Sequence, residues 1–179
     1  MATLLTIFIF CIRLWSTTSL AIGENYGKHA MWPQVTHIVV YWQDKVSRPN
    51  PTSIPVIAPV NGSNTFFGFT SMIDNKLTQK PDPNSKLVGR AQGFYASSSQ
   101  QEVAFLMIMN FVFLDGEFNG STITLIGRNP ALSPQRELSI IGGTNSFQFA
   151  RGSALLKTKK FDPNTGDATV EYNLSVMHF

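Results

Sequence analysis

The sequence predicts an all-β domain built as an antiparallel barrel or a sandwich. No stretch carries an apolar stripe with a 3.6-residue period over more than two turns, so no long helix is expected. Short apolar or alternating segments are instead separated by turns rich in glycine, proline, asparagine and aspartate. A chain of 179 residues is expected to form one domain with a substantial core.

The N-terminal residues 1–21 have the pattern of a secretory signal peptide. An apolar run from Leu4 to Trp15 is followed by polar residues and by the small-residue pattern Ser19-Leu20-Ala21. A membrane anchor is the alternative, but the run is too short to span a bilayer. Residues 22–34 are predicted to be a loose leader, and we expect a secreted protein that keeps no membrane attachment after cleavage.

Cysteine content and glycosylation motifs agree with secretion. The only cysteine, Cys11, lies in the predicted signal peptide, so the mature chain is expected to have no disulfide and no thiol nucleophile. Three Asn-X-Ser motifs, at Asn61, Asn119 and Asn173, predict N-glycosylation.

The first predicted strand ends in an isolated acid. Alternate residues from Thr36 to Asp44 share one face, which is apolar except at its two ends. Asp44 either caps a turn or faces an enclosed apolar space. In the first position it has a structural role, and in the second it is a candidate for a catalytic role. Residues 45–65 contain four prolines and predict an extended loop, and residues 66–78 predict a second strand.

The second half of the chain predicts further strands, at 87–98, 103–113, 121–130 and 168–179, with a hairpin over 136–158. Residues 103–113 are apolar on both faces, so a strand there needs a cover, of which a subunit interface is the simplest. A helix also fits this pattern, but the aromatic and β-branched residues favour a strand. In the last segment, Ala168, Val170, Tyr172, Leu174 and Val176 are expected to face inward.

Charge and motifs exclude several classes of function. The net charge is +3 without clusters of Lys and Arg, which argues against nucleic acid as a partner. No nucleotide-binding loop, zinc-protease motif or nucleophile elbow is present, and the three histidines are widely spaced, so neither a metal nor a cofactor is expected. Only 14% of residues are charged, which suggests apolar surface hidden in a pocket or an oligomer interface.

Five segments carry a resemblance to the plant dirigent proteins. They are "YWQD", "GRAQGFYASS", "DGEFNGSTITLIGRNP", "RELSIIGGTNSFQFARGSALLKT" and "DATVEYNLSVMHF". The resemblance runs from Val35 to the C-terminus. It implies that residues 35–179 form a closed antiparallel barrel of about eight strands, similar to allene oxide cyclase, with an apolar central pocket. It further implies a homotrimer in the apoplast.

The resemblance also implies a function without a cofactor. A separate laccase or peroxidase makes phenoxy radicals from a monolignol such as coniferyl alcohol, and the dirigent protein positions two radicals so that one coupling geometry is reached. Dirigent proteins also include pterocarpan synthases, which close a ring in a single isoflavanol through a quinone methide. A third possibility is a cell-wall or defence protein whose pocket has no catalytic role.

The family's pocket residues correspond to specific positions of this sequence. Its first-strand acid corresponds to Asp44, its tyrosine to Tyr95, its arginine to Arg136 and its threonine to Thr158. The expected roles are proton exchange for Asp44, binding of ligand oxygens for Tyr95 and Arg136, and shaping of the wall for Thr158. Asn129 is also expected to contact substrate, at a position where some lignan-forming members carry a second acid.

Overall fold

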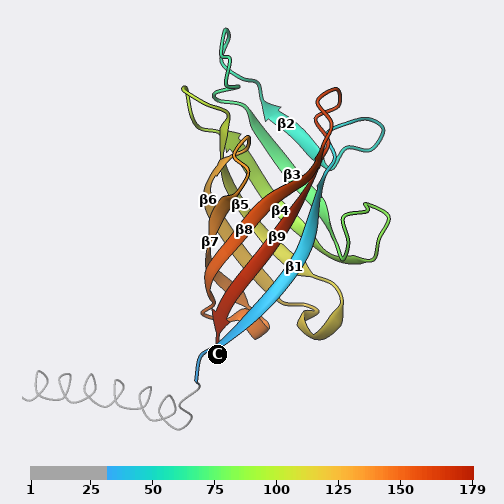
Figure 1. Cartoon of the computed structure of the whole chain (residues 1–179), viewed down its shortest axis with the longest axis vertical. Helices are drawn as coiled ribbons and strands as arrows, with labels where there is room; N and C mark the ends of the chain where they lie inside the picture. Colours follow the sequence, from blue (N-terminus) through green and yellow to red (C-terminus); the bar gives the residue numbers. More distant parts are fainter. Residues whose placement is uncertain (1–31) are drawn as a thin grey trace, which may run out of the picture. The chain divides into compact units, whose positions relative to one another are not determined.

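Nine antiparallel strands run from Gln34 to His178 in the computed structural model, which describes residues 32–179 (Figure 1). They are β1 (Gln34–Asp44), β2 (Ser53–Ile57), β3 (Thr70–Thr78), β4 (Leu87–Ser97), β5 (Ala104–Phe113), β6 (Thr122–Pro130), β7 (Arg136–Thr144), β8 (Arg151–Phe161) and β9 (Ala168–His178). Two 3₁₀ turns, η1 (Gly116–Phe118) and η2 (Asn145–Phe147), lie in the loops. The predicted all-β class is confirmed, and no helix in residues 32–179 is long and apolar enough to cross a membrane.

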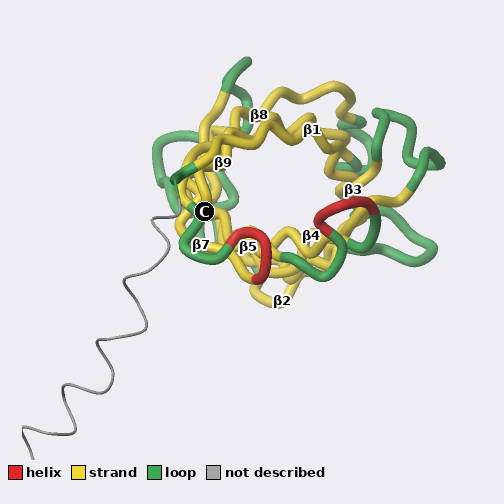
Figure 2. Tube along the Cα trace, turned by 90° about the horizontal axis from the view of Figure 1, so that it is seen from below, coloured by secondary structure: helices red, strands yellow, loops and turns green. Residues whose placement is uncertain are grey.

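Eight of the strands close into a barrel. The order in the sheet is β1-β9-β8-β7-β6-β5-β4-β3-β2, and an additional pairing of β1 with β3 closes the ring. Seen along its axis, the barrel is a continuous ring of strands (Figure 2). The closing seam is short, because only Tyr41, Trp42 and Gln43 of β1 pair with β3, whereas β1 pairs with β9 along its whole length. The expected barrel of about eight strands is therefore confirmed.

The ninth strand, β2, corrects the prediction of an extended loop over residues 45–65. Ser53 to Ile57 pair with the first half of β3, on the edge that β1 occupies farther along the same strand. Prolines at a sheet edge are tolerated because an edge strand needs only one of its sides for hydrogen bonds. The second strand was also predicted to begin too early, since residues 66–69 precede β3 as a loop.

The other predicted strands agree with the structure to within a few residues. β5 is a strand and not a helix, and the inward residues predicted for β9 are buried or half-buried. Within the predicted hairpin over 136–158, β7 and β8 pair directly, and η2 lies in the turn between them. The predicted signal peptide and most of the leader lie outside the described residues.

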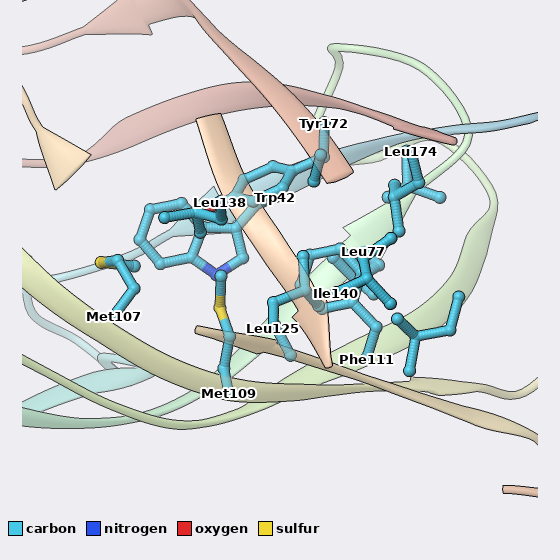
Figure 3. Close-up of a cluster of buried hydrophobic side chains, with 14 of the residues drawn as sticks. Trp42, Leu77, Met107, Met109, Phe111, Leu125, Leu138, Ile140, Tyr172 and Leu174 are labelled. Carbon is cyan, nitrogen blue, oxygen red and sulfur yellow. The ribbon is translucent and has the colours of Figure 1, made fainter. Parts of the chain in front are cut away.

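The middle of the barrel is filled by the inward faces of its strands (Figure 3). Met107, Met109 and Phe111 of β5 are fully or almost fully buried and belong to one cluster with Leu125 and Tyr172. Burial of each such side chain contributes roughly 1.5–3 kcal/mol, so this cluster is a main source of stability. The end near the C-terminus is closed by aromatic rings, in which Phe147 packs at 4.8–5.7 Å from neighbouring rings, those of Phe118, Phe113 and His178.

Candidate functional site

A cavity of about 590 Å³ occupies the opposite end of the barrel. The wall contains Trp42, Val103, Phe105, Met107 and Val170, which are apolar or aromatic. Seven polar side chains also line it. Two are Ser133 and Lys157, and the other five are those that the sequence analysis singled out: Asp44, Tyr95, Asn129, Arg136 and Thr158. A mostly apolar cavity with a few polar groups is typical of a small-ligand site. The structure therefore brings all five candidates together, and the predicted apolar pocket is present.

The strands explain why these side chains converge. Asp44 ends β1, Asn129 lies at the end of β6, Arg136 starts β7 and Thr158 lies late in β8. Neighbouring strands run in opposite directions, so the end of one strand and the start of the next meet at the same end of the barrel. Each of these side chains therefore lies at or near the end of its strand, beyond the packed core.

Of the two positions expected for Asp44, the structure shows the second: the side chain faces the enclosed space, and the residue is 9% exposed. Its Oδ1 accepts hydrogen bonds from Ser53 Oγ and from Asn75 Nδ2, the second at 3.2 Å. Its Oδ2 is 3.5 Å from the hydroxyl of Tyr95. Burial raises the pKa of Asp44 to about 6, although the hydrogen bonds from Ser53, Asn75 and Tyr95 act in the opposite direction. A carboxyl group with this pKa can both donate and accept a proton near neutral pH.

Tyr95 stays protonated beside this carboxyl group. The residue is 7% exposed, and burial together with the charge of Asp44 raises the pKa of the phenol above its ordinary value. The ring lies 5.3 Å from that of Phe105 and 6.4 Å from that of Trp42. These contacts fix the hydroxyl as a hydrogen-bond donor at the edge of the cavity.

Arg136 links two segments of the cavity wall that lies opposite Asp44 and Tyr95. Its Nη1 donates to Thr158 Oγ1 at 2.7 Å and lies 3.1 Å and 3.3 Å from the carbonyl oxygens of Ala131 and Ser133. The guanidinium therefore connects the β6–β7 loop to β8. Burial lowers the pKa of Arg136 from its ordinary value, although a guanidinium remains charged at any pH at which the protein is folded.

Two polar atoms on this wall have no hydrogen-bond partner in the described part of the chain. They are Oδ1 of Asn129, an acceptor, and Nε of Arg136, a donor, and both are buried. Buried polar groups are normally paired, so unpaired groups that line a cavity are available to a ligand. A hydroxyl group of a ligand can donate to such an acceptor and accept from such a donor.

The sequence analysis missed Ser53 and Asn75, which contact Asp44. Asn75 is fully buried and alternates with Ser71, Ile73 and Leu77 on the inward face of β3. This alternation in "SMIDNKL" was the available signal, because an asparagine on an otherwise core-facing row needs a partner. Ser53 had no such signal, since its segment was predicted to be a loop.

The other predicted positions lie outside the barrel. Asn61, Asn119 and Asn173 are exposed, as glycosylation requires. Gln43 points away from the cavity and joins three strands, because it donates to Thr78 at 2.9 Å and accepts from Thr169 at 2.8 Å. Thr169 alternates with the inward residues of β9, but it is buried under this contact.

Comparison with known proteins decides the family. Residues 35–177 match the family described as dirigent-like protein. The chain belongs to the dirigent family. Dirigent protein 7 of Arabidopsis thaliana is 42% identical over the full length of both chains.

Relatives with a named activity are pterocarpan synthases. Pterocarpan synthase 1 of Glycyrrhiza echinata is 45% identical, over 80% of this dirigent chain and 78% of the relative. The solved structure of the pterocarpan synthase dirigent protein GePTS1 superposes with a TM-score of 0.78 at 44% identity, covering 85% of this chain and 89% of the other. The barrel and its strand order are thus those of the dirigent fold.

Proposed function

We propose that this dirigent protein guides the stereoselective coupling of phenoxy radicals, such as those of monolignols, that a separate laccase or peroxidase generates. The observation that carries the proposal is the presence of two polar sites in one apolar cavity. Asp44 and Tyr95 form the first, on β1 and β4, and Asn129 with Arg136 forms the second, on β6 and β7. Around the closed ring these two sites lie on opposite walls.

Two polar sites suit two phenolic units. Each phenolic oxygen binds at one wall while the aromatic rings occupy the apolar space between, so that one face of each radical meets the other. The two unpaired electrons then form one carbon–carbon bond, and each ring becomes a quinone methide. Ring closure needs a hydroxyl to add to the methide carbon and give up its proton, while the methide oxygen gains one. Asp44, with a pKa of about 6, is suited to carry that proton.

A second candidate is a pterocarpan-synthase-like cyclisation of one isoflavanol. The observation in its favour is that Asp44 is the only carboxylate among the residues lining the cavity, which is sufficient for a reaction with one leaving hydroxyl. In that reaction Asp44 donates its proton to the hydroxyl that leaves as water, and the phenol conjugated with that carbon loses its own proton, which restores Asp44 and gives the quinone methide. A second phenol of the same molecule then forms a bond to the methide carbon and loses its proton, while the methide oxygen gains one. The similarity to pterocarpan synthases supports this candidate.

The first experiment is chiral chromatography of products from coniferyl alcohol, with laccase alone and with laccase plus the purified protein. Guidance predicts an enantiomeric excess that grows with protein concentration and disappears without the oxidase. Cyclisation predicts conversion of an isoflavanol without oxidase. A racemic product in the first assay and no conversion in the second would contradict both candidates and favour a wall or defence protein without catalysis.

Asp44→Asn is the decisive variant in either assay. We expect a loss of about a hundredfold or more in the active reaction, because positioned acid–base groups contribute roughly 10²–10⁴ in rate. Asp74→Asn is the matched control. Asp74 lies on the outer face of β3, where it pairs with Arg90, so its replacement should leave the reaction unchanged.

We also propose that the protein is a secreted, glycosylated homotrimer. The outward residues of β5 support this, since Leu106, Ile108 and Val112 form an apolar row that is exposed or half-exposed. Neighbouring outward residues Phe94 and Ile126 extend it onto β4 and β6. The mass of the secreted protein in solution, before and after removal of glycans, tests both statements.

A further inference from the structure

The edge strand β2 contributes a single side chain to the interior. Ser53 is 1% exposed, whereas Ile54, Val56 and Ile57 of the same strand are 54–56% exposed. The chain turns back after β1 so that the backbone nitrogens of Thr52 and Ser53 both donate to the carbonyl of Lys45, at 2.8 and 3.0 Å. The hydroxyl of Ser53 is thereby held against the carboxylate of Asp44.

Asn75 approaches the same carboxylate oxygen from the next strand. Its Nδ2 donates to Asp44 Oδ1 and to Ser53 Oγ, both at 3.2 Å, and its Oδ1 accepts from Thr52 Oγ1. Ser53, Asn75 and Thr52 thus form one hydrogen-bonded cluster behind the carboxylate. In contrast, the only hydrogen-bonding contact of Oδ2 within residues 32–179 is the 3.5 Å contact with Tyr95. The two oxygens of Asp44 are therefore not equivalent.

We propose that Ser53 and Asn75 are positioning residues that hold Oδ1 of Asp44, so that Oδ2 alone faces the cavity and exchanges a proton with the substrate. This inference rests on the proposed function, because it assigns the acid–base step to one oxygen of Asp44. It also gives β2 a role: the strand lies outside the ring but supplies the hydroxyl that fixes the acid.

Two donors on one oxygen have two physical consequences. They fix the rotation of the carboxyl group, so that the free oxygen keeps one direction relative to the ligand. They also stabilise the ionised form, which opposes the rise in pKa that burial causes. The other titratable groups coupled electrostatically to Asp44 are Tyr95, Asp167 and Tyr172. Ser53 also hydrogen-bonds to Tyr95 and lowers the pKa of that phenol, so Ser53→Ala raises it further and leaves the phenol protonated throughout the titration of Asp44. Asn75→Leu leaves that hydrogen bond in place.

Ser53→Ala and Asn75→Leu each remove one hydrogen-bond donor to Asp44 Oδ1. Two measurements report the effect on the titration of Asp44. The first is the titration of Asp44 in the ligand-free protein, from the carboxyl resonances of chain labelled with carbon-13 aspartate, assigned with Asp44→Asn. The second is the pH profile of whichever reaction the protein guides. We expect both the titration and the matching limb of the profile to move to higher pH by about one unit. Turnover should fall more than substrate affinity.

Two controls separate positioning from simple stabilisation. Ser53→Thr keeps the hydroxyl and should retain the wild-type titration, and Val56→Ala changes an exposed residue of the same strand and should alter nothing. An unchanged titration midpoint in both Ser53→Ala and Asn75→Leu would overturn the inference, as would a loss of activity that is uniform across pH. If neither reaction occurs in the wild-type protein, the proposed function fails and the substrate part of the inference fails with it. The ligand-free titration still decides whether the two side chains hold the carboxylate.

Discussion

The two ends of the barrel differ although the same strands run through both. β5 shows the contrast, because Phe105 at its start lines the cavity while Phe111, near its other end, is fully buried among the rings and aliphatic side chains of the core. At the packed end aromatic rings fill the space, and at the open end the inward positions are polar or face an empty volume. Stability and the proposed ligand binding thus belong to different ends of the same strands.

The largest expected effect tests whether the packed end carries the stability. We expect Phe111→Ala to reduce the free energy of unfolding by about 4 kcal/mol, because removal of a buried aromatic ring costs lost burial plus a cavity. Phe105→Ala should cost less than about 1.5 kcal/mol, since its ring already borders a cavity and is only half-buried. Denaturant unfolding of both variants measures the difference, and equal losses would contradict the division between the two ends.

The next effect concerns the carboxyl group that the open end buries. Folding raises the pKa of Asp44 from 3.8 to about 6, so the folded chain binds an extra proton between these values. The stability that this proton uptake gives is complete below about pH 4 and is lost as the pH rises through 6. The total is of the order of 3 kcal/mol at 1.36 kcal/mol for each pKa unit.

Comparison with Asp44→Asn isolates this contribution from other titrating groups. The wild-type protein should lose stability relative to the variant between roughly pH 4 and 7, by up to about 3 kcal/mol. Urea unfolding at several pH values gives the difference curve. A flat curve would show that Asp44 is more hydrated than its burial indicates.

The smallest effect tests the hydrogen bonds that hold the mouth of the cavity. Thr158→Val removes the acceptor 2.7 Å from Arg136 Nη1, and we expect a loss of about 1 kcal/mol with faster proteolysis of the loop at 131–135. Thr124→Val is the matched control, because that threonine makes a 2.8 Å hydrogen bond to Asn110 on the outer face. Its loss should be below about 0.5 kcal/mol and should leave the loop intact.

Strands were predicted correctly where their residue pattern or composition reflects which faces are buried. β9 alternates between apolar and polar residues because one of its faces is the core, and β5 was recognised from its aromatic and β-branched residues. β2 was missed because its two hydrogen-bonding sides are not equivalent. Only the side of β2 that faces β3 forms backbone hydrogen bonds to another strand, so Pro55 does not break the strand. The exposed residues of β2 also do not alternate with buried apolar residues, which is the pattern that identifies a core strand.

The five site residues were predicted by resemblance, and their surroundings were not. Asp44 could be placed on an inward face by counting, but its partners come from residues 9 and 31 positions away. Such contacts depend on the register between strands, which no local pattern specifies. Arg136 was expected to hold ligand oxygens, and the structure adds that its Nη1 supports the β6–β7 loop.

The short seam between β1 and β3 has a consequence for local opening. Only three residues of β1 pair across it, so separating these two strands breaks few hydrogen bonds, and their amides should exchange with deuterium sooner than those between β1 and β9. Asp44 follows this seam directly, and Tyr95 lies one strand beyond β3. A ligand held by both side chains would tie the seam shut and slow that exchange. Deuterium uptake at residues 41–43 therefore provides a way to screen phenolic ligands before any product is known.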